Sequence, residues 1–139
     1  GDSMAIGGNH FIHIIRRNLD VNIMLFNNQI YGLTKGQYSP TSPMGAKTKT
    51  SPQGTIEQPF NPGELVMGAQ GTFFARTVDT NPKHMTEVMF EAARHDGTSL
   101  VEIMQNCIIF NDDAHKLITS REKRRTSTDA GTWQTDDFR

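Results

Sequence analysis

The chain has 139 residues, a length typical of a single compact domain, which argues against a multidomain machine. Its 14 Lys and Arg residues nearly balance its 15 Asp and Glu residues, so the net charge of −1 provides no general field for binding nucleic acid. No run of apolar residues approaches the roughly 18 of a membrane-spanning helix, and we expect a cytoplasmic protein that binds neither nucleic acid nor membrane.

Apolar spacing predicts helices that alternate with strands along the first hundred residues. Residues 4–19 carry apolar side chains at helical intervals, and Asp2 and Ser3 before them are candidate N-cap residues. Residues 21–26 form a short apolar run typical of a buried parallel strand. The same reasoning predicts, in order, a helix over residues 63–70, a strand over 72–78, a helix that begins at Pro82 after Asn81, and a strand over 99–104.

This alternation indicates an α/β domain built on a parallel sheet. Because the first predicted helix precedes its strand, the pattern also implies a strand that comes before residue 1. We therefore expect a parallel-sheet α/β fold that is incomplete at its N-terminus.

Two segments have no regular period. Residues 27–62 are rich in Gly, Pro, Ser, Thr and Asn, and a loop of this length is often functional. Beyond His115 a short, mostly basic run is followed by polar residues. We expect residues 1–115 to form the domain and residues 116–139 to be a disordered or loosely docked tail. A nucleic-acid-binding arm is the less favoured alternative, because a short basic run is usually only solvated.

A ligand site is expected at the carboxyl ends of the strands, where open parallel sheets bind ligands. Gly1 and Asp2 at the start, and Asn27 and Asn28 after the first predicted strand, would meet there. Glycine allows close backbone approach to phosphate, and neutral Asn and carbonyl oxygens suit Mg²⁺ when phosphates supply the charge. These residues indicate a magnesium diphosphate site, although Asn-rich turns also serve for chain reversal alone.

The same residues resemble the thiamine-diphosphate motif, in which Gly-Asp-Gly is followed after a spacer by Asn-Asn. With Gly1 as the last glycine of the triplet, residues 2–26 form a spacer of 25 residues, which suits the motif. The metal-binding aspartate of the motif would then precede residue 1, and Asp2 does not inherit its role.

A more specific resemblance covers residues 1–115. The stretch NNQIYGLTKGQYSPTSP at residues 27–43 closely resembles the beta subunits of 2-oxoacid:ferredoxin oxidoreductases, most of all the 2-oxoglutarate type. The likeness extends to IGGNH at 6–10, RRN at 16–18, PFNP at 59–62 and CIIFND at 107–112. The segment from Lys116 onward has no counterpart in the family.

The resemblance implies a set of site residues. The Asn28 side chain and the Ile30 carbonyl would bind Mg²⁺. Lys35 would attract the carboxylate of a 2-oxoacid, with a solvated loop lysine as an equal alternative, and Leu33 would shape the same pocket. The backbone that would face the diphosphate belongs to Gly1, Asp2, Gly32, Leu33 and Thr34.

Cys107 resembles the last of four cysteines that hold a [4Fe–4S] cluster in this family, thiolate being the usual ligand of such clusters. The other three would lie before residue 1. In this chain alone we expect a buried free thiol.

The family reaction is oxidative decarboxylation of a 2-oxoacid with coenzyme A to acyl-CoA and CO₂, with the electrons passed to ferredoxin. The resemblance implies a beta subunit that binds thiamine diphosphate and Mg²⁺ and works with an alpha subunit, which supplies the catalytic acid; we assign no catalytic residue here. It favours 2-oxoglutarate over other 2-oxoacids, whose enzymes share most of the loop.

We expect the chain to be a truncated piece of such a subunit, inactive alone and weak in binding the cofactor. Two alternatives stay open. One is another thiamine-dependent decarboxylase, which the sequence of the loop after Asn28 disfavours. The other is a noncatalytic interaction module that kept the fold.

Overall fold

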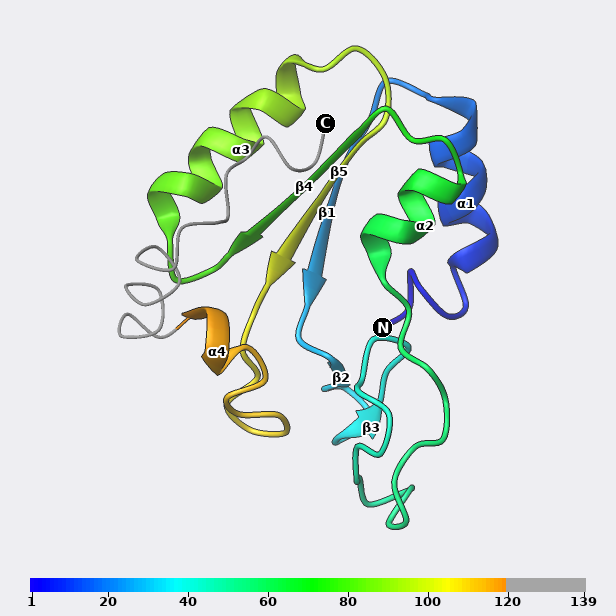
Figure 1. Ribbon diagram of the computed structural model, residues 1–139, viewed down its shortest axis with the longest axis vertical. Coiled ribbons are helices and arrows are strands. Elements are labelled where there is room, and N and C mark those ends of the chain that lie inside the picture. Colours follow the sequence, from blue (N-terminus) through cyan, green and yellow to red (C-terminus); the bar gives the residue numbers. More distant parts are fainter. Residues whose placement is uncertain (120–139) are drawn as a thin grey trace.

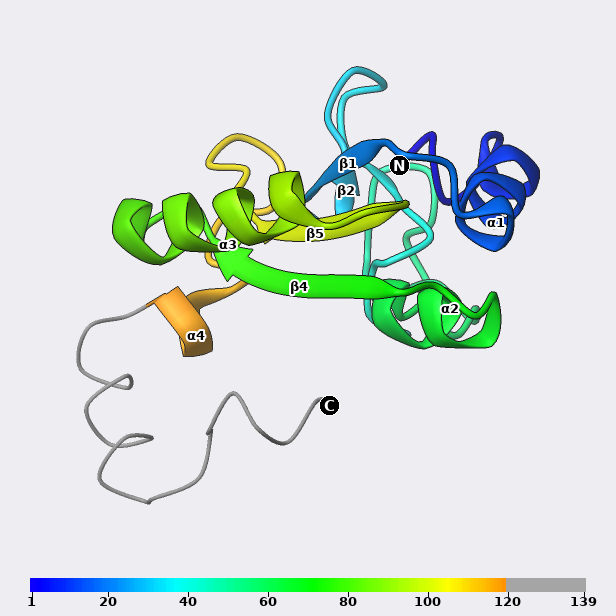
Figure 2. The same ribbon diagram turned by 90° about the horizontal axis from the view of Figure 1, so that it is seen from above.

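The computed structural model describes residues 1–119, in which a three-stranded parallel sheet lies between helices (Figure 1). The strands are β1 (Asn22–Asn27), β4 (Phe73–Val78) and β5 (Ser99–Met104), with β5 in the centre. Helices α1 (Gly8–Arg17) and α2 (Pro62–Gly68) pack on one face, and α3 (Pro82–Arg94) packs on the other (Figure 2). The predicted α/β class and parallel sheet are confirmed.

The three strands begin and end level with one another. Asn22 and Phe73 both pair with Ser99 at the start of β5, and Asn27 and Val78 both pair with Met104 at its end. The carboxyl ends of the strands therefore form one straight edge, which we call the carboxyl edge. The chain start and the loops after β1 and β5 lie at this edge (Figure 1).

The core is divided into two layers by the alternation of side chains along the strands. Every residue of β5 is buried, as expected for a central strand covered on both faces. The layer under α1 and α2 is built from Met4, Phe11, Ile15, Leu25, Val66 and Leu100. The layer under α3 is built from Ala92, Val101 and Ile103.

Asparagine–proline pairs start α2 and α3. The Asn61 side chain accepts a hydrogen bond from the Gly63 N–H, and the Asn81 side chain accepts one from the His84 N–H. In each helix a proline follows at the first position, where its missing N–H costs nothing. The start predicted at Pro82 is confirmed.

The predicted start of the first helix is wrong. Helix α1 begins at Gly8 rather than residue 4, and its N-cap is Gly7, which has no side-chain cap. Asp2 caps nothing with its side chain; its backbone carbonyl accepts the Gly7 N–H at 2.7 Å in a turn. Two adjacent glycines have low helix propensity, and a Cβ on Gly7 would come within 3.1 Å of the Ser3 backbone. The turn leaves Ile6 88% exposed.

The segment predicted to be a loop contains a small hairpin. Strands β2 (Ile30–Tyr31) and β3 (Gln37–Tyr38) pair in antiparallel fashion directly after β1. At the other end of the described chain, α4 (Lys116–Thr119) is the first part of the segment predicted to be a tail. The rest of that prediction concerns residues 120–139, which lie outside the described residues. Within residues 1–119 no helix is both long and apolar enough to cross a membrane.

Candidate functional site

The predicted site residues lie at the carboxyl edge, where β1 runs into β2 through residues 27–30, here called the double turn. Asn27 Oδ1 accepts a hydrogen bond from the Gln29 N–H, and Asn28 Oδ1 accepts one from the Ile30 N–H, both at 3.2 Å. These are two consecutive Asx turns, in which a side chain imitates a backbone acceptor. Gln29 between them has a left-handed φ of 56°.

The double turn has the donor chemistry that Mg²⁺ requires. Asn28 Oδ1 gives one lone pair to the Ile30 N–H, and an amide oxygen carries two. A second neutral oxygen is the carbonyl of Ile30, whose backbone is fixed by pairing with Tyr38. Neutral oxygens fit a divalent cation whose charge is balanced by phosphate. Asn28 and Ile30 therefore could hold the metal of a magnesium diphosphate.

Gly1 lies against the ring of Tyr31, the residue directly after the double turn. A Cβ on Gly1 would overlap the Tyr31 ring, so only glycine allows this approach. Burial, and to a smaller extent the Asp2 carboxylate, raise the pKa of Tyr31 above its usual value. The phenol is therefore neutral at physiological pH. The structure thus brings Gly1, Asp2 and Tyr31 together.

The loop that joins β2 to β3 carries the remaining predicted residues. It is closed by the Gly36 N–H, which donates to the Tyr31 carbonyl at 2.9 Å, and by the Lys35 N–H, which donates to Gly32 at 3.0 Å. Leu33 and Lys35 are exposed, and Lys35 has a left-handed φ of 65°. Thr34 Oγ1 lies 3.4 Å from the Tyr31 carbonyl. The loop is therefore closed on itself and exposes Leu33, Thr34 and Lys35.

Sequence reasoning missed a buried polar network directly behind the double turn. The Asn27 amide nitrogen donates to Glu102 Oε1, and Arg76 Nε donates to Glu102 Oε2, both at 2.7 Å. Thr41 Oγ1 donates to Asn27 Oδ1 at 2.7 Å. His115 Nε2 lies 2.9 Å from the Asn27 carbonyl oxygen. The signal in the sequence is Glu102 itself, the one charged residue in β5.

Cys107 follows β5 at the same edge and is half-buried rather than buried as expected. The Asn111 N–H donates to the Cys107 carbonyl at 2.8 Å, and the Asn111 side chain donates to the Asn28 carbonyl at 3.0 Å. A Cβ on Gly36 would lie 3.1 Å from the Phe110 ring. The turn that contains Cys107 is therefore packed against both the double turn and the β2–β3 loop. Within residues 1–119 no three His, Cys, Asp or Glu residues are placed to bind a metal together.

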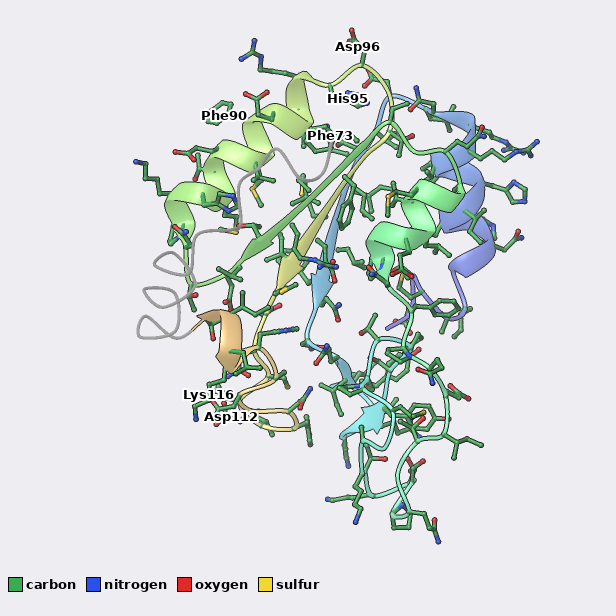
Figure 3. All side chains as sticks on the ribbon, in the orientation of Figure 1. Phe73, Phe90, His95, Asp96, Asp112 and Lys116 are labelled. Atoms are coloured by element: carbon green, nitrogen blue, oxygen red, sulfur yellow. The ribbon has the colours of Figure 1, made fainter. Side chains whose placement is uncertain are left out.

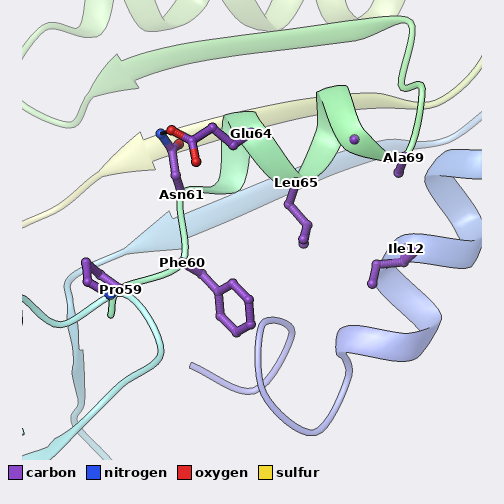
Figure 4. A pocket seen from close by; sticks show the side chains of 8 residues that line it. Ile12, Pro59, Phe60, Asn61, Glu64, Leu65 and Ala69 are labelled. Atoms are coloured by element: carbon purple, nitrogen blue, oxygen red, sulfur yellow. Dashed lines mark hydrogen bonds between the residues drawn. The ribbon is translucent and has the colours of Figure 1, made fainter. Parts of the chain in front are cut away.

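A cavity of about 510 Å³ opens beside the polar network. Its walls include Asn27, Thr41, Asn61, Arg76, Glu102 and His115. A second cavity, of about 430 Å³, lies between α1, α2 and the chain before α2 and is lined mainly by apolar groups such as Ile12, Phe60 and Leu65 (Figure 4). Only the first cavity adjoins the double turn.

His95 lies far from the site. It is at the opposite end of the sheet from Asp112 and Lys116 (Figure 3). His95 Nε2 is 2.7 Å from Thr72 Oγ1, and its ring lies 5.3 Å from that of Phe73. These contacts give it a structural role. His10 and His13 are exposed on α1.

Comparison with known families decides the assignment. Residues 1–103 match the family described as thiamine pyrophosphate enzyme, C-terminal TPP binding domain. The chain belongs to this family of thiamine pyrophosphate enzymes. The predicted resemblance to thiamine-diphosphate-binding enzymes is thereby confirmed.

Within the thiamine pyrophosphate enzymes, the chain is similar to subunits of 2-oxoacid oxidoreductases. It is 57% identical over 112 residues to the 2-oxoglutarate oxidoreductase subunit KorB of Mycobacterium tuberculosis, covering 81% of this chain and 30% of that protein. It is 48% identical over 107 residues to the 2-oxoglutarate synthase subunit KorB of Archaeoglobus fulgidus, covering 77% of this chain and 40% of that protein. The predicted resemblance to these beta subunits is confirmed, and the chain spans less than half the length of either relative.

A solved structure agrees with the sequence comparisons. The 2-oxoglutarate:ferredoxin oxidoreductase of Magnetococcus marinus, with 2-oxoglutarate, coenzyme A and succinyl-CoA bound, superposes with a TM-score of 0.80 at 36% identity. The match covers 91% of this chain and 42% of that chain. The similarity therefore includes the fold of almost the whole described chain.

Proposed function

We propose that this chain forms the part of a 2-oxoacid:ferredoxin oxidoreductase beta subunit that binds thiamine diphosphate and Mg²⁺, with 2-oxoglutarate as the substrate. The observation that carries the proposal is the double turn at the carboxyl edge. Its oxygens suit a magnesium diphosphate, and it occurs in a thiamine pyrophosphate enzyme whose relatives include KorB subunits.

In this proposal Asn28 Oδ1 and the Ile30 carbonyl bind Mg²⁺. The diphosphate would be held by main-chain N–H groups, which can bind phosphate oxygens without a cationic side chain. Its contacts come from the backbone of Gly1, Asp2, Gly32, Leu33 and Thr34. The close packing of Gly1 on Tyr31 supports this arrangement, because it brings the chain start to the metal-binding turn.

The substrate approaches from the β2–β3 loop. Lys35 is exposed there and carries a charge that complements a 2-oxoacid carboxylate. Leu33, which is 98% exposed, is apolar and would contact the substrate beside Lys35. Cys107, half-buried at the same edge, would be one ligand of a [4Fe–4S] cluster in the intact subunit.

When bound, thiamine diphosphate supplies the nucleophile for the keto carbon and the electron sink for loss of CO₂. The residues of this chain hold and orient that group through its metal and phosphates. We assign no catalytic acid to the chain, and we propose that the alpha subunit supplies one. Coenzyme A takes the acyl group and ferredoxin takes the electrons, so the heteromer rather than this chain alone carries the activity.

The test is an assay of the assembled heteromer with coenzyme A, Mg²⁺, thiamine diphosphate and a viologen as electron acceptor. A panel of pyruvate, a branched-chain 2-oxoacid and 2-oxoglutarate separates the substrates. We expect viologen reduction to depend on coenzyme A and to be fastest with 2-oxoglutarate. Faster viologen reduction with another 2-oxoacid would overturn the assignment of 2-oxoglutarate as the substrate. Absence of reduction with all three 2-oxoacids would overturn the proposed function.

A further inference from the structure

The Asn27 amide is oriented by groups on both of its sides. On one side the Gln29 N–H and the Thr41 hydroxyl both donate to Oδ1. On the other side the amide nitrogen donates to Glu102 Oε1. A carboxylate accepts hydrogen bonds and donates none, so the Asn27 nitrogen must face it. Glu102 therefore determines that the Asn27 oxygen faces the double turn.

Glu102 is itself held firmly. It is 1% exposed in the central strand β5, and its second oxygen accepts from Arg76 Nε on the neighbouring strand β4. Taking a carboxylate out of water is costly unless its oxygens are paired, and here both are. The Arg76 side chain is 42% exposed and closes the network toward the cavity. The side chains of Asn27, Glu102 and Arg76 thus form a hydrogen-bonded row across the three strands, directly behind the double turn.

We propose that Glu102 is a positioning residue for the metal site. By orienting the Asn27 amide, its carboxylate holds the double turn in the conformation that presents Asn28 Oδ1 and the Ile30 carbonyl to Mg²⁺. This inference rests on the proposed function, because it assigns Glu102 to the support of that same site.

The pattern of hydrogen-bond donors and acceptors predicts the effect of replacing Glu102 with glutamine. In Glu102→Gln the side chain keeps its shape but has one acceptor oxygen for two donors, Arg76 Nε and the Asn27 nitrogen. The Asn27 amide then flips to accept from the glutamine, and its nitrogen faces the Gln29 N–H. Two N–H groups cannot form a hydrogen bond with each other, so the Asx turn between Asn27 and Gln29 is lost.

A reciprocal exchange restores the pattern. In the double variant Asn27→Asp/Glu102→Gln, the glutamine oxygen accepts from Arg76 and the glutamine nitrogen donates to one oxygen of the introduced aspartate. The other oxygen of that aspartate again accepts from the Gln29 N–H and the Thr41 hydroxyl. Every hydrogen bond of the network is then formed, and donor and acceptor are exchanged only in the bond between residues 27 and 102. A role limited to filling space in the sheet would give no such rescue.

The experiment measures Mg²⁺-dependent affinity for thiamine diphosphate by calorimetry on the intact subunit in its assembled heteromer. We expect E102Q to weaken binding about 10- to 100-fold, the usual range for residues that orient metal ligands. The double variant should return to within about threefold of the wild type. The matched control is Glu91→Gln, whose carboxylate is 67% exposed on α3, and it should bind as the wild type does.

Wild-type affinity in E102Q, or a double variant that binds no better than E102Q, overturns the inference. If E102Q does not fold, the double variant decides alone: affinity near the wild type supports the role of Glu102, and a loss of tenfold or more overturns it. The Asn28→Ala variant separates the two proposals. If N28A binds normally the proposed function fails, whereas if N28A loses binding and E102Q does not, only the inference about Glu102 fails.

Discussion

The Asn111 side-chain nitrogen donates a hydrogen bond to the main-chain carbonyl oxygen of Asn28 across 3.0 Å. This bond joins the turn after β5, which begins at Cys107, to the turn after β1. Because the Asn111 N–H also donates to the Cys107 carbonyl, one residue connects the proposed cluster ligand with the proposed metal ligand. The two proposed cofactor sites are therefore connected directly through the side chain and backbone of Asn111.

Replacing Asn111 with alanine should weaken Mg²⁺-dependent binding of thiamine diphosphate. The change removes one hydrogen bond that fixes the backbone at Asn28, and we expect a loss of about 1 kcal/mol, or about fivefold in affinity. Calorimetry on the assembled heteromer measures it. The control Gln53→Ala removes an exposed amide far along the loop and should change nothing. Equal affinities for the wild type and N111A would show that the bond does not support the site.

Lysine 35 should act on the substrate and not on the cofactor. In Lys35→Met we expect the KM for 2-oxoglutarate to rise about tenfold, because one charge pair with the carboxylate is lost, while affinity for thiamine diphosphate is unchanged. Steady-state kinetics with a viologen acceptor give the first value and calorimetry the second. Lys47→Met, at another exposed loop lysine, is the control. An unchanged KM in K35M would return Lys35 to the role of a solvated loop residue.

Two glycines should respond to alanine in opposite directions. Gly97 has a φ of 119°, and a Cβ there would lie 2.5 Å from the Asn18 side chain, so G97A should destabilise the protein by about 2–3 kcal/mol. Gly68 ends α2 with nothing within 4 Å of an added Cβ, so G68A should stabilise it by about 0.5 kcal/mol. Urea denaturation measures both. A stable G97A protein would mean that the contact between Gly97 and Asn18 does not hold α1 against the start of β5.

Tyr31 should ionise at a higher pH than an ordinary tyrosine. Burial raises its pKa and the Asp2 carboxylate adds to the effect, so the folded protein favours the neutral phenol. The contribution of the neutral phenol to the free energy of unfolding is fully present below the usual pKa of 10.0. It is lost as the pH rises through the raised pKa of the folded protein. In an ultraviolet titration, Tyr31→Phe should remove the ionisation at the highest pH. Asp2→Asn should move that ionisation to lower pH.

If the ionisation at the highest pH persists in Y31F, it belongs to another tyrosine. The packing of Gly1 on the Tyr31 ring then does not cause the raised pKa. Tyr38→Phe is the matched control. It should leave the ionisation at the highest pH in place.

The elements that could be predicted from the sequence are those with strong local signals. The Asn–Pro pair at Pro82 identified the start of α3, and the apolar run at 99–104 identified β5 as a strand. The start of α1 was misplaced because apolar spacing extended the helix through the glycines at Gly7 and Gly8, where the backbone turns instead. Helix periodicity carries no information about such a turn.

The candidate site was only partly predictable for a related reason. Asn28 could be identified because it belongs to a local motif. The network around Glu102 could not, because its partners Asn27 and Arg76 are distant in sequence and meet it only through strand pairing. Asn111 reaches Asn28 across 83 residues in the same way. Contacts of this kind depend on the order and register of strands, which apolar patterns leave open.

The central claim is that the turn after β1 binds the metal of thiamine diphosphate through Asn28. Its most direct test is a calorimetric titration of the assembled heteromer with thiamine diphosphate, in Mg²⁺ and in EDTA, for the wild type, Asn28→Ala and the control Gln53→Ala. We predict binding that needs Mg²⁺ in the wild type and in Q53A and that is weakened at least about 100-fold in N28A. Equal, Mg²⁺-dependent affinity in N28A and the wild type would contradict the account.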